Sequence, residues 1–205
     1  MAVQIIKEGY PVGRQVATTL SSCGTVNSAV SSYVSVSHKQ LAKEIYTTIT
    51  LTNLPQTVVN GTEYQGTLLW TMPAGLIKFF NANISLAQKT TSDPTTTINA
   101  SVTGAVSVGS ATASNVALTG TMADIIPSTA FTSSATQNVA GATVTATLDA
   151  NDDLSEEFNL DGQSTAVGVY LNSAFATTAD VDADGTMVWN GTIEINWYYR
   201  KGVFV

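Results

Sequence analysis

The chain has 205 residues, which suits one β-domain, since β-sandwiches and β-barrels of about 200 residues are routinely single domains. Charged residues make up only 11% of it, less than half of the roughly 25% typical of globular proteins, while hydrophobic residues make up 44%. The net charge of −7 argues against nucleic-acid binding, which requires a basic surface, and the single cysteine excludes an internal disulfide framework.

Residues 1–43 have little core pattern, and we expect them to form an extended N-terminal arm that neighbouring molecules order. One short helical turn is predicted within this arm, at Ser37–Lys43. No apolar run has the length of a secretion signal or a membrane span, so we expect neither. The arm is mildly basic, because its charged residues are Lys7, Arg14, Lys39, Lys43 and Glu8.

From Glu44 onward, apolar and polar residues alternate with a period of two, which predicts half-buried strands. Turn signals such as Asn60-Gly61 separate them. Strands at this spacing, with no long helix, predict an all-β fold: an antiparallel β-sandwich or jelly-roll-like single domain over residues 44–205. The predicted strands are Ile45–Thr52, Tyr64–Met72, Leu76–Ala87, Ile98–Val108, Val116–Met122, Val144–Leu148, Val167–Leu171 and Thr186–Arg200.

The last strand, Thr186–Arg200, is predicted to be the spine of the core. Trp189 and Trp197 share its apolar face, and Gly191 marks a bulge or bend in the middle of the strand. The third tryptophan, Trp70, also lies on the inward face of its strand by the same alternation. Tyr46 and Tyr198 fall on the opposite faces, which makes them candidates for an interface.

Catalytic chemistry has little support in this sequence. His38 is the only histidine, and we expect it to be an exposed residue on a polar segment rather than a catalytic base. Cys23 has no neighbour that would lower its thiol pKa, so an inert thiol is expected. The acidic residues of Asp149–Asp161 crowd into one loop, whereas a hydrolase holds its acids on separate rigid elements. We therefore expect no enzyme activity, no catalytic residue and no cofactor.

Asp180, Asp182 and Asp184 are the one metal-site candidate. With Gly185 they match the first half of an EF-hand loop, in which alternate carboxylates can surround a calcium ion. The twelfth position of that loop is Gly191, where the motif requires a bidentate Glu. A turn of solvated aspartates is therefore the favoured interpretation.

Several segments resemble capsid-associated proteins of tailed bacteriophages. The segments are Ala166–Asn172, Asp184-Gly185-Thr186, Gly191–Trp197 and Trp70–Gly75. The proteins that they resemble are small β-sandwich decoration, or cement, proteins that sit on the outer capsid as trimers. The resemblance implies a virion protein on the outer capsid surface, made in the host cytoplasm, whose partners are the major capsid protein and further copies of itself. It implies no catalysis, no nucleic-acid partner and no membrane partner.

We expect the arm to supply the contacts of such a protein to its capsid or to a neighbouring subunit. Its capsid-docking candidates are Val3, Ile5, Ile6, Lys7, Val12 and Arg14. An alternative from another class is a glycan- or receptor-binding module of a phage tail or a surface adhesin. That alternative requires aromatic side chains on a solvent-facing surface.

Overall fold

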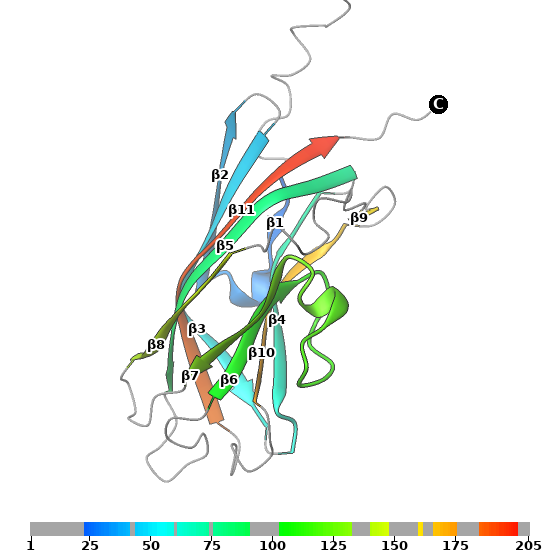
Figure 1. Cartoon of the computed structure of the whole chain (residues 1–205). Coiled ribbons are helices and arrows are strands. Elements are labelled where there is room, and N and C mark those ends of the chain that lie inside the picture. The colour runs from blue at the N-terminus through cyan, green and yellow to red at the C-terminus, as the bar shows by residue number, and fades with distance from the viewer. Residues whose placement is uncertain are drawn as a thin grey trace, which may run out of the picture.

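The computed structural model describes most of the chain, and its architecture is all β (Figure 1). Among the described residues the regular elements are strands and two short 3-10 helices, with no α-helix. Two antiparallel sheets pack against each other, which confirms the predicted β-sandwich. The described residues are 23–41, 44–59, 61–73, 76–90, 103–132, 140–147, 160–161, 166–175 and 185–200.

Sheet A and sheet B each contain one strand from the segment before residue 44. From edge to edge, sheet A consists of β1 (Thr25–Val26), β4 (Tyr64–Thr71), β10 (Gly168–Phe175), β6 (Thr103–Gly109) and β7 (Ile126–Thr132). Sheet B consists of β2 (Val34–Leu41), β3 (Glu44–Val58), β11 (Gly185–Arg200), β5 (Leu76–Thr90) and β8 (Ala140–Thr147), with β9 (Leu160–Asp161) paired to β5. The two 3-10 helices are η2 (Ser28–Val30) and η3 (Gly120–Met122).

Eight of these strands have the order of a jelly roll. Sheet B contains the series β3-β11-β5-β8, and sheet A contains the series β4-β10-β6-β7. The chain therefore passes from one sheet to the other at most of its connections, as double-sheet jelly rolls do. β1 and β2 extend the two sheets beside β4 and β3. Residues 25–26 and 34–41 are thus part of the sheets, while residues 1–22 lie outside the described residues.

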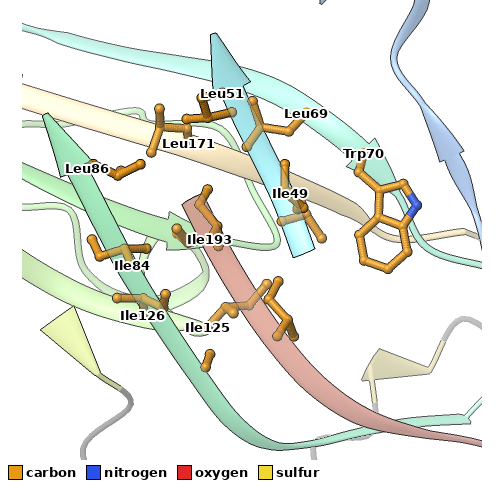
Figure 2. Packing of buried hydrophobic residues seen from close by; sticks show 14 of the residues in the cluster. Ile49, Leu51, Leu69, Trp70, Ile84, Leu86, Ile125, Ile126, Leu171 and Ile193 are labelled. Carbon is orange, nitrogen blue, oxygen red and sulfur yellow. The ribbon is translucent and has the colours of Figure 1, made fainter. Parts of the chain in front are cut away.

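The core forms where the inward faces of the two sheets meet, and β11 lies at its centre, as predicted. β11 pairs with β3 on one side and with β5 on the other. Trp189, Trp197 and Trp70 are fully buried, which confirms the inward placement of all three. Figure 2 shows Ile193 of β11 among aliphatic side chains from both sheets. Gly191 has a φ of 131° at a break in the β3–β11 register, so the predicted irregularity is confirmed, but the extra residue of the bulge lies in β3.

One buried amide connects the two sheets through polar contacts inside this core. The Oε1 atom of Gln56 in β3 accepts hydrogen bonds from Trp189 Nε1 at 2.7 Å and from Ser173 Oγ of β10 at 2.8 Å. Its Nε2 atom donates to the Leu171 carbonyl of β10 at 2.9 Å. Because an unpaired buried amide is costly, this contact set favours one relative placement of the sheets. Alternation alone gave no signal for it.

By alternation, Tyr64, Gly66, Leu68, Trp70 and Met72 are expected to share one face of their strand. This prediction is wrong, because a bulge divides the strand. The register between β10 and β4 shifts at Val169/Tyr170, which leaves Leu69 as an extra residue in β4. Leu69 and Trp70 are therefore both fully buried. Before the bulge the orientation is reversed, and Thr67 faces inward, where its Oγ1 accepts a hydrogen bond from Gln56.

The predicted strand Ile45–Thr52 was expected to end at Asn53-Leu54-Pro55. That end is also wrong, because β3 continues to Val58. Pro55 is tolerated there because β2 pairs only with residues 44–51 of β3, so the proline faces a described partner strand on one side alone. Asn53 takes a positive φ of 51° in this stretch, and its N–H donates to Asn190 Oδ1 at 2.8 Å. The side-chain contact across the bulge keeps the two strands in register.

Two further local predictions are corrected. Ser37–Lys43 is not a helical turn, because Val34–Leu41 is strand β2, whose backbone groups pair with β3. Val116–Met122 is not a strand, because Leu118 and Gly120 both take left-handed conformations, with φ values of 46° and 62°. Residues 110–125 instead form a long connection between β6 and β7, which we call the excursion.

Candidate interaction surface

The excursion covers part of the outer face of sheet A, and one side chain holds it there. Asn172 lies in β10 and is fully buried. Its Oδ1 accepts a hydrogen bond from the Ala113 N–H at 2.8 Å, and its Nδ2 donates to the carbonyls of Ala111 and Met122 at 2.9 and 2.8 Å. Figure 1 shows the connection between β6 and β7 outside sheet A. A central strand of the sheet thus fixes this connection through three hydrogen bonds.

A carboxylate and a small apolar cluster reinforce the excursion. Asp124 accepts hydrogen bonds from the N–H and the hydroxyl of Ser110, at 2.7 and 2.5 Å. Burial raises the pKa of Asp124 above its ordinary value, although the contacts with Ser110 oppose that shift. Leu118 is buried in a cluster with Ala113 and Ala174. The outer face of sheet A is therefore occupied in part by the protein's own chain.

The outer face of sheet B differs in that most of its described side chains stay exposed or half-buried, although Val188 of β11 is buried. We call the outward side chains of β2, β3, β11 and β5 the open face. Cross-strand pairing arranges polar residues of these strands, most of them small and one of them Glu194, in rows. One row is Ser35, Thr50, Thr192 and Ser85, and the next is Ser37, Thr48, Glu194 and Asn83. Hydroxyl and amide groups can exchange hydrogen bonds with a partner at little electrostatic cost.

At one end of the open face, aromatic side chains replace the small polar ones. We call Glu44, Tyr46, Phe80 and Tyr198 the aromatic corner. The ring centroids of Phe80 and Tyr198 are 4.8 Å apart, and those of Tyr46 and Phe80 are 6.4 Å apart. The first pair is inclined by 36° and the second by 88°, so the three rings do not form one flat platform. The corner is a small aromatic cluster on an otherwise polar surface.

Glu44 joins the two tyrosines of the aromatic corner. The Tyr46 hydroxyl donates to Glu44 Oε2 at 2.5 Å, and the Tyr198 hydroxyl donates to Glu44 Oε1 at 2.9 Å. The hydrogen bond from Tyr46, and to a smaller extent that from Tyr198, lowers the pKa of Glu44. The same contacts raise the pKa values of both tyrosines. The carboxylate therefore stays ionised at neutral pH and fixes the orientation of both rings.

The sequence identified part of this surface. Tyr46 and Tyr198 lie on outward faces, as the alternation predicted, whereas Phe80 and Glu44 were not recognised. Phe80 is exposed while Phe79 is fully buried, because the β11–β5 register shifts at Asn196/Trp197. The adjacent pair of phenylalanines indicated that one of the two rings faces outward, since neighbouring residues of a strand face opposite sides, but it did not indicate which one. Glu44 was detectable in the same way, two residues before Tyr46.

The two residues considered for nucleophilic chemistry lie elsewhere. The prediction of an exposed His38 is wrong: its ring packs 5.4 Å from that of Trp70, and its Nδ1 forms a 2.9 Å hydrogen bond with Thr47 Oγ1. Burial lowers the pKa of His38, which favours a neutral ring. Cys23 is buried, and burial raises the pKa of its thiol, in agreement with an inert group.

The remaining predicted site residues are not placed by the structure. The metal candidates Asp180, Asp182 and Asp184 lie outside the described residues, as do the arm residues Val3, Ile5, Ile6, Lys7, Val12 and Arg14. Within the described ranges, no three His, Cys, Asp or Glu side chains gather in a way that could hold a metal ion.

Comparison with known proteins adds no assignment for this surface. No protein-family model matches the chain, and no curated protein sequence matches it. In the part of the chain that the structure describes, no helix is long and apolar enough to cross a membrane.

Proposed function

We propose that this protein is a structural virion protein that decorates and stabilises the outer surface of a bacteriophage capsid by binding across capsomers. The observation that carries the proposal is the difference between the two outer faces. Sheet A carries the protein's own excursion, whereas sheet B presents rows of small polar groups and an aromatic corner to solvent. Exposed apolar groups that gather on one face are typical of a protein-binding surface.

The fold and the composition also support this proposal. Jelly rolls are common in viral capsid proteins, although this support is an analogy at the level of the fold. With only 11% charged residues, the surface has little charge to keep neighbouring proteins apart. We propose the major capsid protein as the partner and a homotrimer as the binding unit, since linked copies multiply weak contacts. The proposal gives the protein no catalytic role and no cofactor.

Co-sedimentation with capsids assembled without the protein tests this function. Ser85→Arg places a long cation in the middle of the open face, and Thr121→Arg places the same side chain on the exposed excursion as a matched control. We expect the first variant to lose at least tenfold in capsid occupancy and the control to bind like the wild type. Equal occupancy of all three proteins would mean that the open face is not the capsid-binding surface.

A glycan- or receptor-binding module is the second candidate, and the aromatic corner is the observation that favours it. Exposed rings beside a carboxylate can stack on a sugar and accept hydrogen bonds from its hydroxyl groups. The inclination of the rings is less suited to stacking, because a sugar ring requires a flat aromatic surface. Binding of the purified protein to a glycan array, abolished by Phe80→Ala, would favour this second function over capsid decoration.

A further inference from the structure

The aromatic corner contains an unusual share of the exposed apolar surface. Six large hydrophobic side chains are exposed among the described residues: Tyr33, Leu41, Val59, Phe80, Val116 and Tyr198. Three of these converge on the corner. Leu41 pairs with Glu44 across β2 and β3, Glu44 pairs with Tyr198 across β3 and β11, and the Phe80 ring contacts the Tyr198 ring. Leu41 is 48% exposed, so the apolar surface extends across the ends of β2, β3, β11 and β5.

We propose that the aromatic corner is the docking site for the N-terminal segment, residues 1–22, of a second copy of this chain. The proposal rests on the self-association in the proposed function and names the surfaces that meet. Each copy then donates one segment and accepts another. Such exchange closes into a ring when the copies are related by rotation.

The length of the segment and the place where it joins the fold support this occupant. The described chain begins at Cys23, and β1 then pairs with Thr71 and Trp70 at the end of β4 in sheet A. The corner lies on the outer side of sheet B, the opposite layer of the sandwich. Twenty-two residues can extend over about 70 Å, which is enough to reach a neighbouring molecule.

The chemistry of the segment matches that of the corner. Val3, Ile5, Ile6 and Val12 supply the apolar side chains that an aromatic surface buries. Lys7 and Arg14 are its two basic residues against one acidic residue, Glu8. They are opposite in charge to Glu44, whose ionised form the two tyrosine hydroxyls stabilise. A cation beside Glu44 can form a charge-assisted hydrogen bond, because its oxygens have lone pairs beyond those used by the tyrosines.

The perpendicular arrangement within the corner favours a protein segment over a sugar. The Phe80 ring lies nearly perpendicular to the Tyr46 ring and is inclined to the Tyr198 ring, so the surface is uneven. Branched aliphatic side chains pack into an uneven aromatic surface, whereas a sugar ring needs a flat one. No other large apolar side chain of the described β2, β3, β11 and β5 strands is exposed on the open face, so Ile5 and Ile6 find less apolar surface outside the corner.

Disulfide trapping between two full-length variants tests the contact directly. One variant carries Ile6→Cys and the other Phe80→Cys, and the two are mixed and oxidised. We expect a mixed disulfide-linked dimer to form at least tenfold more than when Ser85→Cys, on the same face but outside the corner, replaces Phe80→Cys. The proposal is wrong if the two acceptor variants trap Ile6→Cys equally, or if no mixed dimer forms.

Sedimentation equilibrium on full-length proteins supplies the energetic test. Phe80→Ser and Ile6→Ser should each weaken self-association at least tenfold, and the double variant should be no weaker than either, because both remove the same contact. Leu41→Ser, at a more exposed position, repeats the test with less risk to folding, and circular dichroism checks each variant. Independent, multiplicative effects of the two substitutions would mean that the residues do not meet.

Two other outcomes would identify a different occupant. The segment docks on its own corner if the wild type is monomeric and a double variant with Ile6→Cys and Phe80→Cys on one chain forms an intrachain disulfide. Unchanged self-association of Phe80→Ser together with loss of glycan-array binding would mean that the corner binds a saccharide. Capsid co-sedimentation is measured separately. Weakened self-association of Phe80→Ser when the wild type also fails to bind capsids would support this inference and contradict the proposed function.

Discussion

Asn172 of β10 and Asn196 of β11 both lie in the middle of a sheet and point away from the core, yet their surroundings differ. Asn172 is fully buried and makes three hydrogen bonds to the excursion. Asn196 is half-buried on the open face, between Tyr46 and Asn81 of the neighbouring strands. The outer face of sheet A therefore contributes to the stability of the monomer. The outward side chains of the described strands of sheet B remain largely accessible to solvent.

Replacing the two asparagines in turn measures this difference. Asn172→Ala should lower the free energy of unfolding by about 3 kcal/mol or more, because it leaves an N–H and two carbonyls of the excursion without their buried partners. Asn196→Ala should change it by less than about 0.5 kcal/mol. Urea denaturation of both variants gives the two values. Equal losses would mean that the open face is as important to the fold as the outer face of sheet A, which the excursion covers and which we call the covered face.

A single methyl group tests how tightly the excursion packs. The Cβ atom of Gly66→Ala would lie 2.2 Å from Thr112 Oγ1, 2.6 Å from Asn172 Oδ1 and 2.7 Å from the Ala113 nitrogen. Relief of these overlaps should cost about 1–3 kcal/mol of stability. Ser85→Ala on the open face is the matched control and should be nearly neutral. If urea denaturation shows Gly66→Ala to be as stable as the wild type, the excursion lies further from sheet A than described.

Acidity should affect the covered face through Asp124. The folded state raises the pKa of this carboxyl by burial, so the ionised form is the one that folding disfavours. In the wild type the buried carboxylate therefore lowers the stability of the fold above the raised pKa, and this loss of stability disappears as the pH falls through that pKa. Asp124→Asn has no such loss, so its stability relative to the wild type should be greatest at neutral pH and should decrease on acidification. Thermal melts across the acid range measure the difference, and a constant difference would contradict the assignment.

The smallest effect on stability is expected for a substitution in the aromatic corner. Glu44→Gln should lower the melting temperature at neutral pH only slightly, because the side chain is accessible to solvent and its hydrogen bonds contribute little to stability there. It should, however, lower the pKa values of Tyr46 and Tyr198 toward the ordinary tyrosine value, since the carboxylate that raises them is gone. A titration followed by NMR resolves the two rings. Unchanged tyrosine titration would show that the carboxylate does not hold the rings in solution.

Glu44 also predicts the sign of a pH effect at the corner. Its pKa is lowered in the folded state, so its contribution to the stability of the fold is present above the ordinary glutamate pKa. That contribution is lost as the pH falls through the lowered, folded-state pKa. Asp124 and Glu44 thus respond to acid in opposite directions. The covered face gains stability on acidification, and the open face loses the contact that orients its tyrosines.

The sequence by itself determined the side of each strand that faces the core wherever the alternation is unbroken. β11 shows this best, because Trp189 and Trp197 are buried as the period of two requires, and Tyr198 is exposed for the same reason. The all-β class and the irregularity at Gly191 follow from equally local signals. In the aromatic corner, the same argument predicted the outward placement of Tyr46 and Tyr198 and was also sufficient for Glu44, two residues before Tyr46.

Only the tertiary structure decided which strands are neighbours and where the alternation breaks. The jelly-roll order joins distant segments, such as Gln56 with Ser173, and no local pattern encodes such a pairing. The bulges that bury Leu69 and expose Phe80 are register shifts between paired strands, so they exist only once the partner strand is in place. Residues 116–122 alternate like a strand, yet they form an irregular excursion, because Asn172, about fifty residues away, supplies hydrogen bonds that hold the excursion in place of a sheet partner.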